Sequence, residues 1–313
     1  MSKKVLIVAS GGDAPGMNAC VESVWTHSRP MGWQVFVAAG FGGLIERLWN
    51  PVTSGGISHL TGCVYKSGRS KAFNTEEGIK LAVKNGKEFD AVIVLGGNGS
   101  LKGAWEKLVG SGVNVLGIPA TIDNDVYFTK NSLGFSSAVE EGVRLVDNLN
   151  ATMRTNDRDH VIQIMGWHCD EITKTIGQAS FADVIDINDN RHTPEQIAQI
   201  MHQNRTGGKE SSTILIQERV EKGKERNFIT EMHESVDAWN QLAAFAGDDF
   251  RGHILGHLIR GAKPSARDRW LGFHYGRVAV ELITKSKFGV GIGLVGDDWV
   301  TMDLGEIKRR NFS

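Results

Sequence analysis

The chain has 313 residues, of which 41% are hydrophobic and 23% charged, and its formal net charge is −1. This composition is typical of a soluble globular protein of about two domains, and it excludes a disordered or fibrous chain. With 35 basic and 36 acidic side chains there is no general positive field to favour nucleic acid or an anionic membrane, so any anion site is local.

Cysteines are few, and apolar runs are short. Cys20, Cys63 and Cys169 include no C-x-x-C pair, which favours a reducing compartment over a disulfide framework or a zinc site. The first apolar run, residues 5–9, is too short for a signal peptide, and no run approaches the ~20 residues that cross a bilayer. We therefore expect a cytoplasmic protein.

Apolar, β-rich runs alternate with segments of helical period. In the first part of the chain the predicted elements are strands at 5–9, 33–39, 91–95 and 113–118 and helices at 17–28, 75–84 and 101–109. Beyond these, the predicted elements are helix 136–153, strand 160–164, helix 171–179, strand 184–187, helix 194–203, strand 213–217, a polar helical stretch 221–249, strand 254–261, helix 266–283 and strand 290–295. Near-continuous apolar strands joined by helices predict an α/β protein with mainly parallel sheets.

Glycines number 38 and cluster directly after predicted strands, at residues 10–16 and 96–100. At the carboxyl ends of parallel strands such turns lead into helix N-termini, where backbone N–H groups can hold phosphate. One glycine-rich turn could be purely structural, but two at equivalent positions favour phosphate binding. Neither turn matches a Walker A loop or a dinucleotide fingerprint.

Two carboxylates follow the fourth predicted strand. Asp123 and Asp125 stand two residues apart in the sequence PATIDND, so they point the same way if the backbone stays extended. One could hold Mg²⁺ while the other accepts a proton from a substrate hydroxyl, which is the division of roles that phosphoryl transfer needs. The same heptapeptide could instead be a turn that caps the next helix.

Five motifs, in chain order, resemble those of the phosphofructokinase family. They are SGGDAPGMN, GGNGS, PATIDND, MGWHCDEIT and GHLIRGAKPSARDR, which begin at residues 10, 96, 119, 165 and 256. The similarity runs from about residue 4 to about residue 300. It implies two Rossmann-like three-layer α/β/α domains with the active site in the cleft between them. The larger, nucleotide-binding domain would comprise residues 1–135 and 259–313, and the smaller, sugar-phosphate-binding domain residues 136–258.

The resemblance also implies a role for each matching residue. Asp123 would be the base that deprotonates the 1-hydroxyl of fructose 6-phosphate, assisted by Thr121 and Arg69, and Asp125 and Asn98 would lie at Mg²⁺. The positions implied for the nucleotide and its phosphates are Gly11, Gly12, Phe41, Arg69, Gly97, Asn98, Gly99 and Ser100. The positions implied for the sugar phosphate are Asp125, Arg158, Met165, Gly166, Glu218, Arg251, His257 and Arg260.

Arg158 and Arg251 match arginines that reach the 6-phosphate from a neighbouring subunit, so the resemblance implies a homo-oligomer, usually a tetramer. Guanidinium groups suit a phosphate dianion whatever the family. Taken singly, some residues have simpler explanations. The arginines could be surface charges, His257 a core histidine and Phe41 a packing residue.

The chain departs from the family at several positions. Gly99 and Ala120 stand where pyrophosphate-dependent members typically have Asp and Lys, so ATP is the predicted donor. Asn98 replaces an aspartate and Trp167 an arginine, which should weaken metal binding and stabilisation of the transferring phosphoryl group.

The positions of the family's effector site differ as well. Arginines of that site are replaced by Glu22, Thr26 and Asn150, and of the expected lysines only Lys209 is matched. A site that has exchanged arginine for glutamate should not hold phosphate, so we expect no activation by ADP.

The leading hypothesis is an ATP- and Mg²⁺-dependent 6-phosphofructokinase of glycolysis, with ATP and fructose 6-phosphate as substrates and no nucleic-acid or membrane partner. Asn98 and Trp167 leave open a weakly active or inactive binding or regulatory subunit. Trp167 also leaves open another ketose phosphate as the acceptor.

Overall fold

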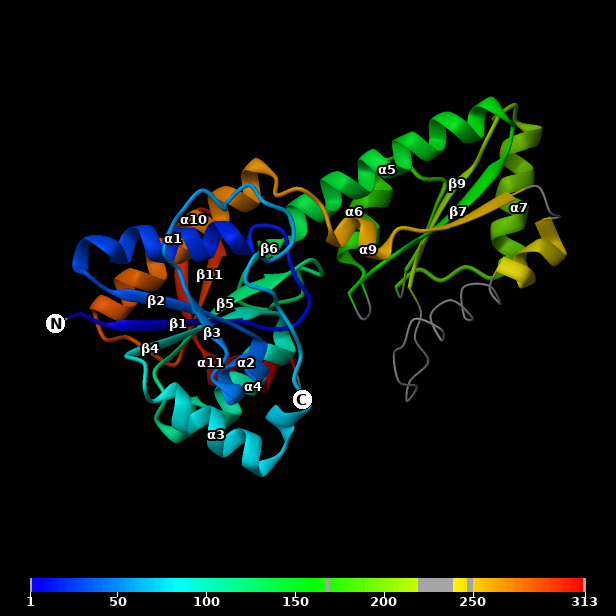
Figure 1. The fold of residues 1–313 in the computed structure, drawn as a ribbon. Coiled ribbons are helices and arrows are strands. Elements are labelled where there is room, and N and C mark those ends of the chain that lie inside the picture. Colours follow the sequence, from blue (N-terminus) through cyan, green and yellow to red (C-terminus); the bar gives the residue numbers. More distant parts are fainter. Residues whose placement is uncertain (1, 167–168, 188, 219–238, 247–249, 312–313) are drawn as a thin grey trace. The chain divides into compact units, whose positions relative to one another are not determined.

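The structure is a computed structural model that divides into two compact units, each with its own sheet (Figure 1). It describes residues 2–166, 169–187, 189–218, 239–246 and 250–311. The first unit combines Met1–Ser137 with Arg260–Ser313, and the second is Ala138–Ile259.

The first unit contains an eight-stranded, mainly parallel sheet. Its strands are β1 (Lys4–Ala9), β2 (Gln34–Ala39), β3 (Trp49–Pro51), β4 (Ala91–Gly96), β5 (Val115–Thr121), β6 (Leu133–Gly134), β11 (Val290–Val295) and β12 (Asp298–Asp303). Their order is β12-β11-β5-β4-β1-β2-β3, with β6 paired to β5. Only the pairings of the end strands, β12 and β3, are antiparallel.

Helices cover both faces of this sheet (Figure 1). They are α1 (Met17–Ser28), α2 (Gly40–Glu46), α3 (Glu76–Gly86), α4 (Asn98–Lys107), α10 (Ala266–Thr284) and α11 (Leu304–Asn311), with short 3₁₀ helices η1 (Arg29–Met31), η2 (Ala72–Asn74) and η3 (Val109–Ser111). Helices α1 and α10 pack on one face, and α2, α3, α4 and α11 on the other.

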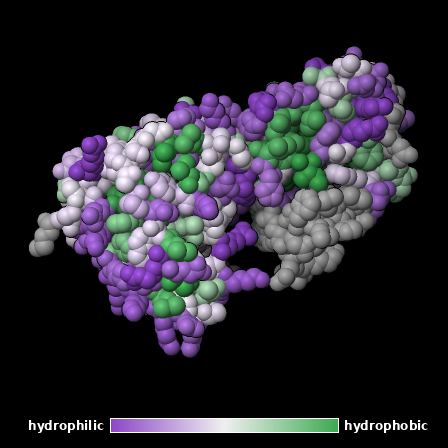
Figure 2. Space-filling model, in the orientation of Figure 1, coloured by the Kyte–Doolittle hydropathy of each residue, from purple (hydrophilic) through white to green (hydrophobic). Residues whose placement is uncertain are grey.

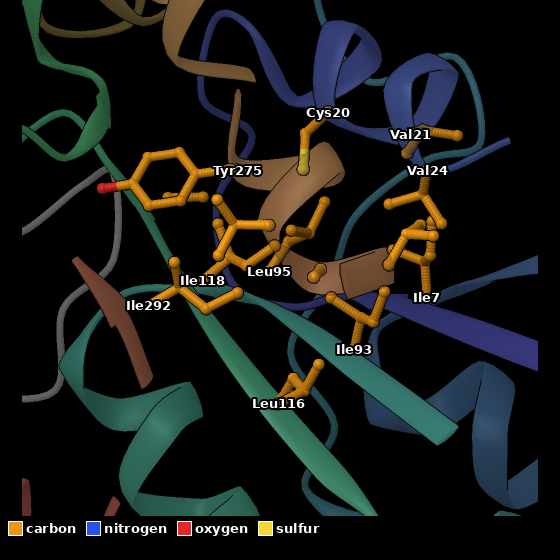
Figure 3. Packing of buried hydrophobic residues seen from close by; sticks show 14 of the residues in the cluster. Ile7, Cys20, Val21, Val24, Ile93, Leu95, Leu116, Ile118, Tyr275 and Ile292 are labelled. Carbon is orange, nitrogen blue, oxygen red and sulfur yellow. The ribbon is translucent and has the colours of Figure 1, made fainter. Parts of the chain in front are cut away.

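Side chains of β1 alternate between two hydrophobic clusters. Val5 and Ile7 belong to the cluster under α1 and α10, part of which is shown in Figure 3. Leu6 and Val8 belong to the cluster under α2, α3, α4 and α11. Because successive strand residues point to opposite faces, a sheet covered on both sides needs apolar residues at every position of its inner strands.

The second unit contains a four-stranded parallel sheet with the order β10-β7-β9-β8. Its elements are β7 (Asp159–Ile164), β8 (Val184–Asp186), β9 (Thr213–Gln217), β10 (Phe250–Ile254), α5 (Phe135–Thr155), α6 (Glu171–Ala179), α7 (Pro194–Thr206) and α9 (Gly256–Arg260). Helix α7 begins where Thr193 and Gln196 form a capping box ahead of Pro194. Val161 and Ile214 pack in a cluster with Met201 of α7.

The predicted α/β class with mainly parallel sheets is confirmed, and some element predictions are wrong. Residues 254–261 do not form the predicted strand. The observed strand β10 already ends at Ile254, and residues 256–260 form the helix α9. Helix α4 begins three residues earlier than predicted, inside the glycine-rich turn. Of the polar stretch 221–249, residues 239–246 are helical and the rest lies outside the described residues.

Hydrophilic side chains cover most of the visible face of the first unit, with small hydrophobic patches among them (Figure 2). Within the described ranges, no helix has the length and apolar character needed to cross a membrane.

Candidate active site

Strand order brings the chemically interesting motifs of the first unit together. Strands β1, β4 and β5 are parallel neighbours, so the segments that follow them meet at one edge of the sheet. The chain proceeds from β1 to β2 on one side and later to β4 on the other side. Such a reversal of strand order is where open α/β sheets bind ligands.

A cavity of about 390 Å³ lies at this edge. It is lined by all eight positions implied for the nucleotide, which are Gly11, Gly12, Phe41, Arg69, Gly97, Asn98, Gly99 and Ser100. It is also lined by Thr121, Asp123, Asp125 and Arg260. All the described residues that line it belong to the first unit.

Hydrogen bonds hold the two glycine-rich turns against each other. The Ser100 hydroxyl donates to Ser10 Oγ at 2.9 Å, which joins the turn after β4 to the turn after β1. The Gly11 N–H donates to the Gly68 carbonyl at 3.0 Å, which places the neighbouring Arg69 beside the first turn. Gly11 has a φ of 96°, a conformation that glycine adopts without strain.

Arg260 enters the cavity across Gly12. Its Nη1 donates to the Asp13 carbonyl at 3.1 Å, and a Cβ added to Gly12 would lie 2.5 Å from the same nitrogen. The absence of a side chain at residue 12 therefore makes room for a guanidinium beside the phosphate-binding turn.

The two carboxylates reach the cavity by a different backbone path from the one expected. Asn124 has a φ of 56°, so the backbone between Asp123 and Asp125 is not extended, which was the condition for the two side chains to point the same way. The Asn124 side chain stabilises this bend, since its Oδ1 accepts from the Ser132 N–H at 2.8 Å and its Nδ2 donates to the Lys130 carbonyl at 3.0 Å. Both carboxylates nevertheless line the cavity, and the next helix, α5, begins only at residue 135.

The oxygen atoms here suit a hard divalent cation. Asn98 Nδ2 donates to the Asp125 carbonyl at 3.0 Å, whereas Asn98 Oδ1 is buried and has no hydrogen-bond partner among the described residues. An amide oxygen and two carboxylates are ligands that Mg²⁺ accepts, with water and phosphate completing the shell. A cluster of three or more His, Cys, Asp or Glu side chains that could bind a metal alone is absent from the described part of the chain.

Phe41 is mainly a packing residue. Its ring is stacked on Phe73, with centroids 3.8 Å apart and an angle of 8° between the planes, and only 5% of the residue is exposed. One face of the ring is therefore covered by Phe73, and little of the side chain is left to line the cavity.

In the second unit, Met165, Gly166, Glu218 and His257 all lie at the carboxyl end of the sheet, just beyond β7, β9 and β10. The Gly166 N–H donates to the Glu218 carboxylate at 3.3 Å, and the Glu218 N–H donates to the Ile164 carbonyl at 2.8 Å. Glu218 is 6% exposed, whereas His257 is exposed and so is not a core histidine.

Arg158 and Arg251 lie at the opposite end of this sheet. Arg158 precedes β7, and Arg251 is the second residue of β10, paired with His160. Met165 lies five residue steps beyond His160 along the chain, which corresponds to about 16 Å. The structure therefore does not bring these arginines to the Glu218 group within one subunit.

Glu22 stabilises a loop of the first unit. Its carboxylate accepts from the backbone N–H groups of Gly56, Ile57 and Ser58 at 2.7, 2.9 and 2.7 Å. Partial burial tends to raise the pKa of Glu22, but these backbone donors outweigh it, so the pKa lies below its ordinary value. A carboxylate of the chain itself thus satisfies N–H groups that could otherwise bind an external anion.

Asn150 and Lys209 have partners within the second unit. Asn150 Oδ1 accepts from the Thr213 hydroxyl at 2.6 Å and lies 2.8 Å from His160 Nε2. The Lys209 ammonium pairs with Asp183 at 2.5 Å. Trp167 lies outside the described residues.

Sequence reasoning missed several residues that line the cavity or join elements of the first unit. Phe73, Asn74 and Lys107 line the cavity, but they belong to no quoted motif. Asp268 is fully buried in α10 and accepts from the N–H groups of Gly134 and Ser137, which ties α10 to the start of α5. The aspartate in the last motif was the only signal for this role.

Comparisons with known proteins agree on one family. The phosphofructokinase family model matches residues 4–283. The "ATP-dependent 6-phosphofructokinase" of Halalkalibacterium halodurans is 31% identical over 99% of this chain and 95% of its own, and that of Lacticaseibacillus casei is 35% identical over 96% and 92%. The phosphofructokinase structure from Saccharomyces cerevisiae matches 98% of this chain with a TM-score of 0.82 and 29% identity, and this chain spans 45% of that longer one. The chain therefore belongs to the phosphofructokinase family.

Proposed function

We propose that the chain is an ATP-dependent 6-phosphofructokinase, which transfers the γ-phosphoryl group of ATP to the 1-hydroxyl of fructose 6-phosphate and acts in glycolysis. The observation that carries the proposal is that Asp123 lines one cavity together with both glycine-rich turns. The names of the bacterial relatives support the same reaction.

In this mechanism Asp123 accepts the proton of the attacking hydroxyl, because a carboxylate near the phosphate site is the kind of base that phosphoryl transfer requires. Thr121 lies beside it, and its Oγ1 accepts from the Asp123 N–H at 3.2 Å, which restrains the loop. Arg69 and Arg260 line the same cavity and provide the cations that stabilise negative charge on the transferring group.

Mg²⁺ belongs to the proposal as the partner of the ATP phosphates. Asn98 Oδ1, which has no hydrogen-bond partner in the described part of the chain, and the Asp125 carboxylate are the oxygens that would hold it. When bound, the ion would neutralise phosphate charge.

The choice of ATP over pyrophosphate rests on Gly99 and Ala120. Both line the cavity, and no described heavy atom lies within 4 Å of a Cβ added to Gly99. A carboxylate at residue 99 would fill this space, whereas glycine leaves it for a nucleotide phosphate.

We assign nucleotide binding to residues 1–135 with 259–313 and sugar-phosphate binding to 136–258. Met165, Gly166, Glu218 and His257 share the carboxyl edge of the second sheet, where α/β proteins bind ligands.

Assembly into a homotetramer completes the proposal. Arg251 lies about 16 Å along the sheet from Met165 and Arg158 lies farther still, so a neighbouring subunit would have to supply them to a shared sugar-phosphate site. Mixed oligomers of Asp123→Asn and Arg251→Ala subunits should then recover activity that neither variant has alone. A cytoplasmic location is supported by the small number of cysteines, which include no C-x-x-C pair.

Two alternatives keep the same fold. A weakly active or inactive binding subunit is favoured by the neutral Asn98 at the metal position. Another ketose phosphate could be the acceptor, since Trp167 stands where the family has arginine.

A coupled assay for fructose 1,6-bisphosphate, run with ATP or pyrophosphate and several ketose phosphates, tests these possibilities. We expect turnover with ATP and fructose 6-phosphate, and a decrease in kcat of about 10²–10⁴-fold in Asp123→Asn. The matched control is Asp297→Asn, which makes the same substitution at an exposed position in the turn between β11 and β12. Turnover that is unchanged in Asp123→Asn would contradict the proposal, and binding of both substrates without product would favour the inactive subunit.

A further inference from the structure

The loop that carries Asp123 and Asp125 is closed at its base by the pairing of β5 with β6. In this pairing Gly134, at the end of β6, lies opposite Thr121, at the end of β5. Thr121 in turn accepts through Oγ1 from the Asp123 N–H at 3.2 Å. The backbone at Gly134 is thus linked to Asp123 through Thr121 alone.

A buried carboxylate from a distant part of the chain holds the base of this loop. Asp268, in the first turn of α10, is fully buried, and its Oδ1 accepts from the Gly134 N–H at 2.9 Å. Its Oδ2 accepts from the Ser137 N–H at 2.7 Å and from the Ser137 hydroxyl. Burial raises the pKa of Asp268, and these donors offset part of the rise. Both carboxylate oxygens therefore anchor the segment in which the loop ends and α5 begins.

The first glycine-rich turn, residues 10–16, packs directly against the same anchor. A Cβ added to Gly16 would lie 3.0 Å from the Asp268 carbonyl oxygen, and a Cβ added to Gly134 would lie 2.7 Å from the Ala14 Cβ. Both glycines have a positive φ, 93° and 108°, which glycine adopts without strain. The turn, the base of the loop and the start of α10 are therefore in contact with no side chain of either glycine between them.

We propose that Asp268 is a positioning residue for the reaction, because by anchoring Gly134 it fixes the distance of Asp123 from the glycine-rich turn at 10–16. This inference rests on the kinase function proposed above. Phosphoryl transfer needs its base and the phosphate in one geometry, and a displacement of about 1 Å can lower a rate by about 10²-fold. Asp268 is not among the described residues that line the cavity, so it acts through Gly134 and not on a substrate.

A purely structural role makes a different prediction. If Asp268 only stabilised the start of α5, its replacement would lower the melting temperature and leave the kcat of the folded enzyme unchanged. Glu22→Gln is the matched control for stability. Glu22 is also a carboxylate of the first unit that accepts from backbone N–H groups, and it is not among the described residues that line the cavity.

The test compares the kinetics of Asp268→Asn, Asp268→Glu and Glu22→Gln with those of the wild type, well below every melting temperature. Asp268→Asn keeps the size of the side chain but places an NH₂ donor where an N–H needs an acceptor. We expect its kcat to fall by about 10–10²-fold while the KM for fructose 6-phosphate changes by less than about twofold. Asp268→Glu keeps the charge and both acceptors but is one methylene longer, so its kcat should fall less. Glu22→Gln should lose stability and keep the wild-type kcat.

A wild-type kcat in the Asp268 variants, or an equal fall in Glu22→Gln, would overturn the inference, and Asp268→Glu decides the question if Asp268→Asn does not fold. Hydrogen exchange at the amides of residues 121–134 gives a readout without turnover. Exchange should be faster in Asp268→Asn or Asp268→Glu than in the wild type and unchanged in Glu22→Gln. Absence of product from the wild type with every donor would refute the kinase function. The exchange experiment would still test the anchor, and equal exchange in all the proteins would overturn it.

Discussion

The Arg260 guanidinium occupies the space in which Gly12 would carry a Cβ. That Cβ would lie 2.5 Å from Nη1 and 3.1 Å from Cζ of the arginine. The position of Arg260, in the last motif, thus requires a glycine at residue 12, in the first motif. The two residues are nearly 250 positions apart in the sequence.

Gly12→Ala should displace Arg260 without unfolding the protein, because the clashing atoms are the end of a flexible side chain. We expect the KM for fructose 6-phosphate to rise by about tenfold or more, since a charged hydrogen bond is lost. Gly110→Ala, where no described atom would contact the new Cβ, should leave KM unchanged. Saturation kinetics and melting temperatures of both variants provide the measurement.

Asn98→Asp should increase the affinity for Mg²⁺, because it exchanges a neutral oxygen ligand for an anionic one. The variant also loses the hydrogen bond from Nδ2 to the Asp125 carbonyl. We therefore expect a lower melting temperature without Mg²⁺ and a larger Mg²⁺-dependent rise than in the wild type. Thermal denaturation over a range of Mg²⁺ concentrations measures both effects, and equal rises in the two proteins would exclude a metal contact at residue 98.

Gly99→Asp should fold normally but lose activity with ATP. The site has open space for a side chain, so the carboxylate enters the cavity and repels the nucleotide phosphates. Gly99→Ala should keep ATP activity because it adds only a methyl group. Steady-state kinetics of both variants with ATP as the phosphoryl donor test this prediction. A Gly99→Asp variant with the wild-type KM for ATP would refute the assignment of the cavity to the nucleotide.

Acidification should destabilise the second unit through His160. Burial and the nearby His253 lower the pKa of His160 to about 4, against an ordinary value of 6.5. The unfolded chain therefore binds a proton that the folded protein excludes between these two values. The free energy of unfolding is highest above pH 6.5 and falls as the pH falls to 4, by on the order of 3 kcal/mol from this residue.

Urea denaturation at pH 7.5 and pH 5 measures this loss. His160→Gln, which keeps an amide donor towards Asn150 but cannot titrate, should show a weaker pH dependence than the wild type. Equal losses in the two proteins would show that other groups account for the acid sensitivity.

ADP should not shift the saturation curve for fructose 6-phosphate, because the Glu22 carboxylate already occupies the backbone N–H groups of residues 56–58. Removing this charge in Glu22→Gln should cost about 1–3 kcal/mol of stability. Curves recorded with and without ADP, and denaturation of the variant, test the two statements. Activation of the wild type by ADP would contradict the first.

The sequence by itself determined the α/β class, the parallel sheets and the segments that contribute to the cavity. Apolar runs such as Val5–Ala9 could be assigned because both faces of an inner strand are buried, and motifs such as 96–100 because glycine-rich turns follow strands. Short elements at the edges, including β3 and β12, were missed because partly exposed strands lack that continuous apolar signal.

Only the tertiary structure decided which side chains share one space. The left-handed bend at Asn124 depends on hydrogen bonds to Ser132 and Lys130, which follow it in the same loop. Lys107 lines the cavity because η2 provides the acceptors that hold it, and Arg158 lies far from Glu218 because a strand runs between them. Such relations arise where a loop folds back on itself or distant segments meet, whereas periodicity and motif spacing contain information only about the local secondary structure.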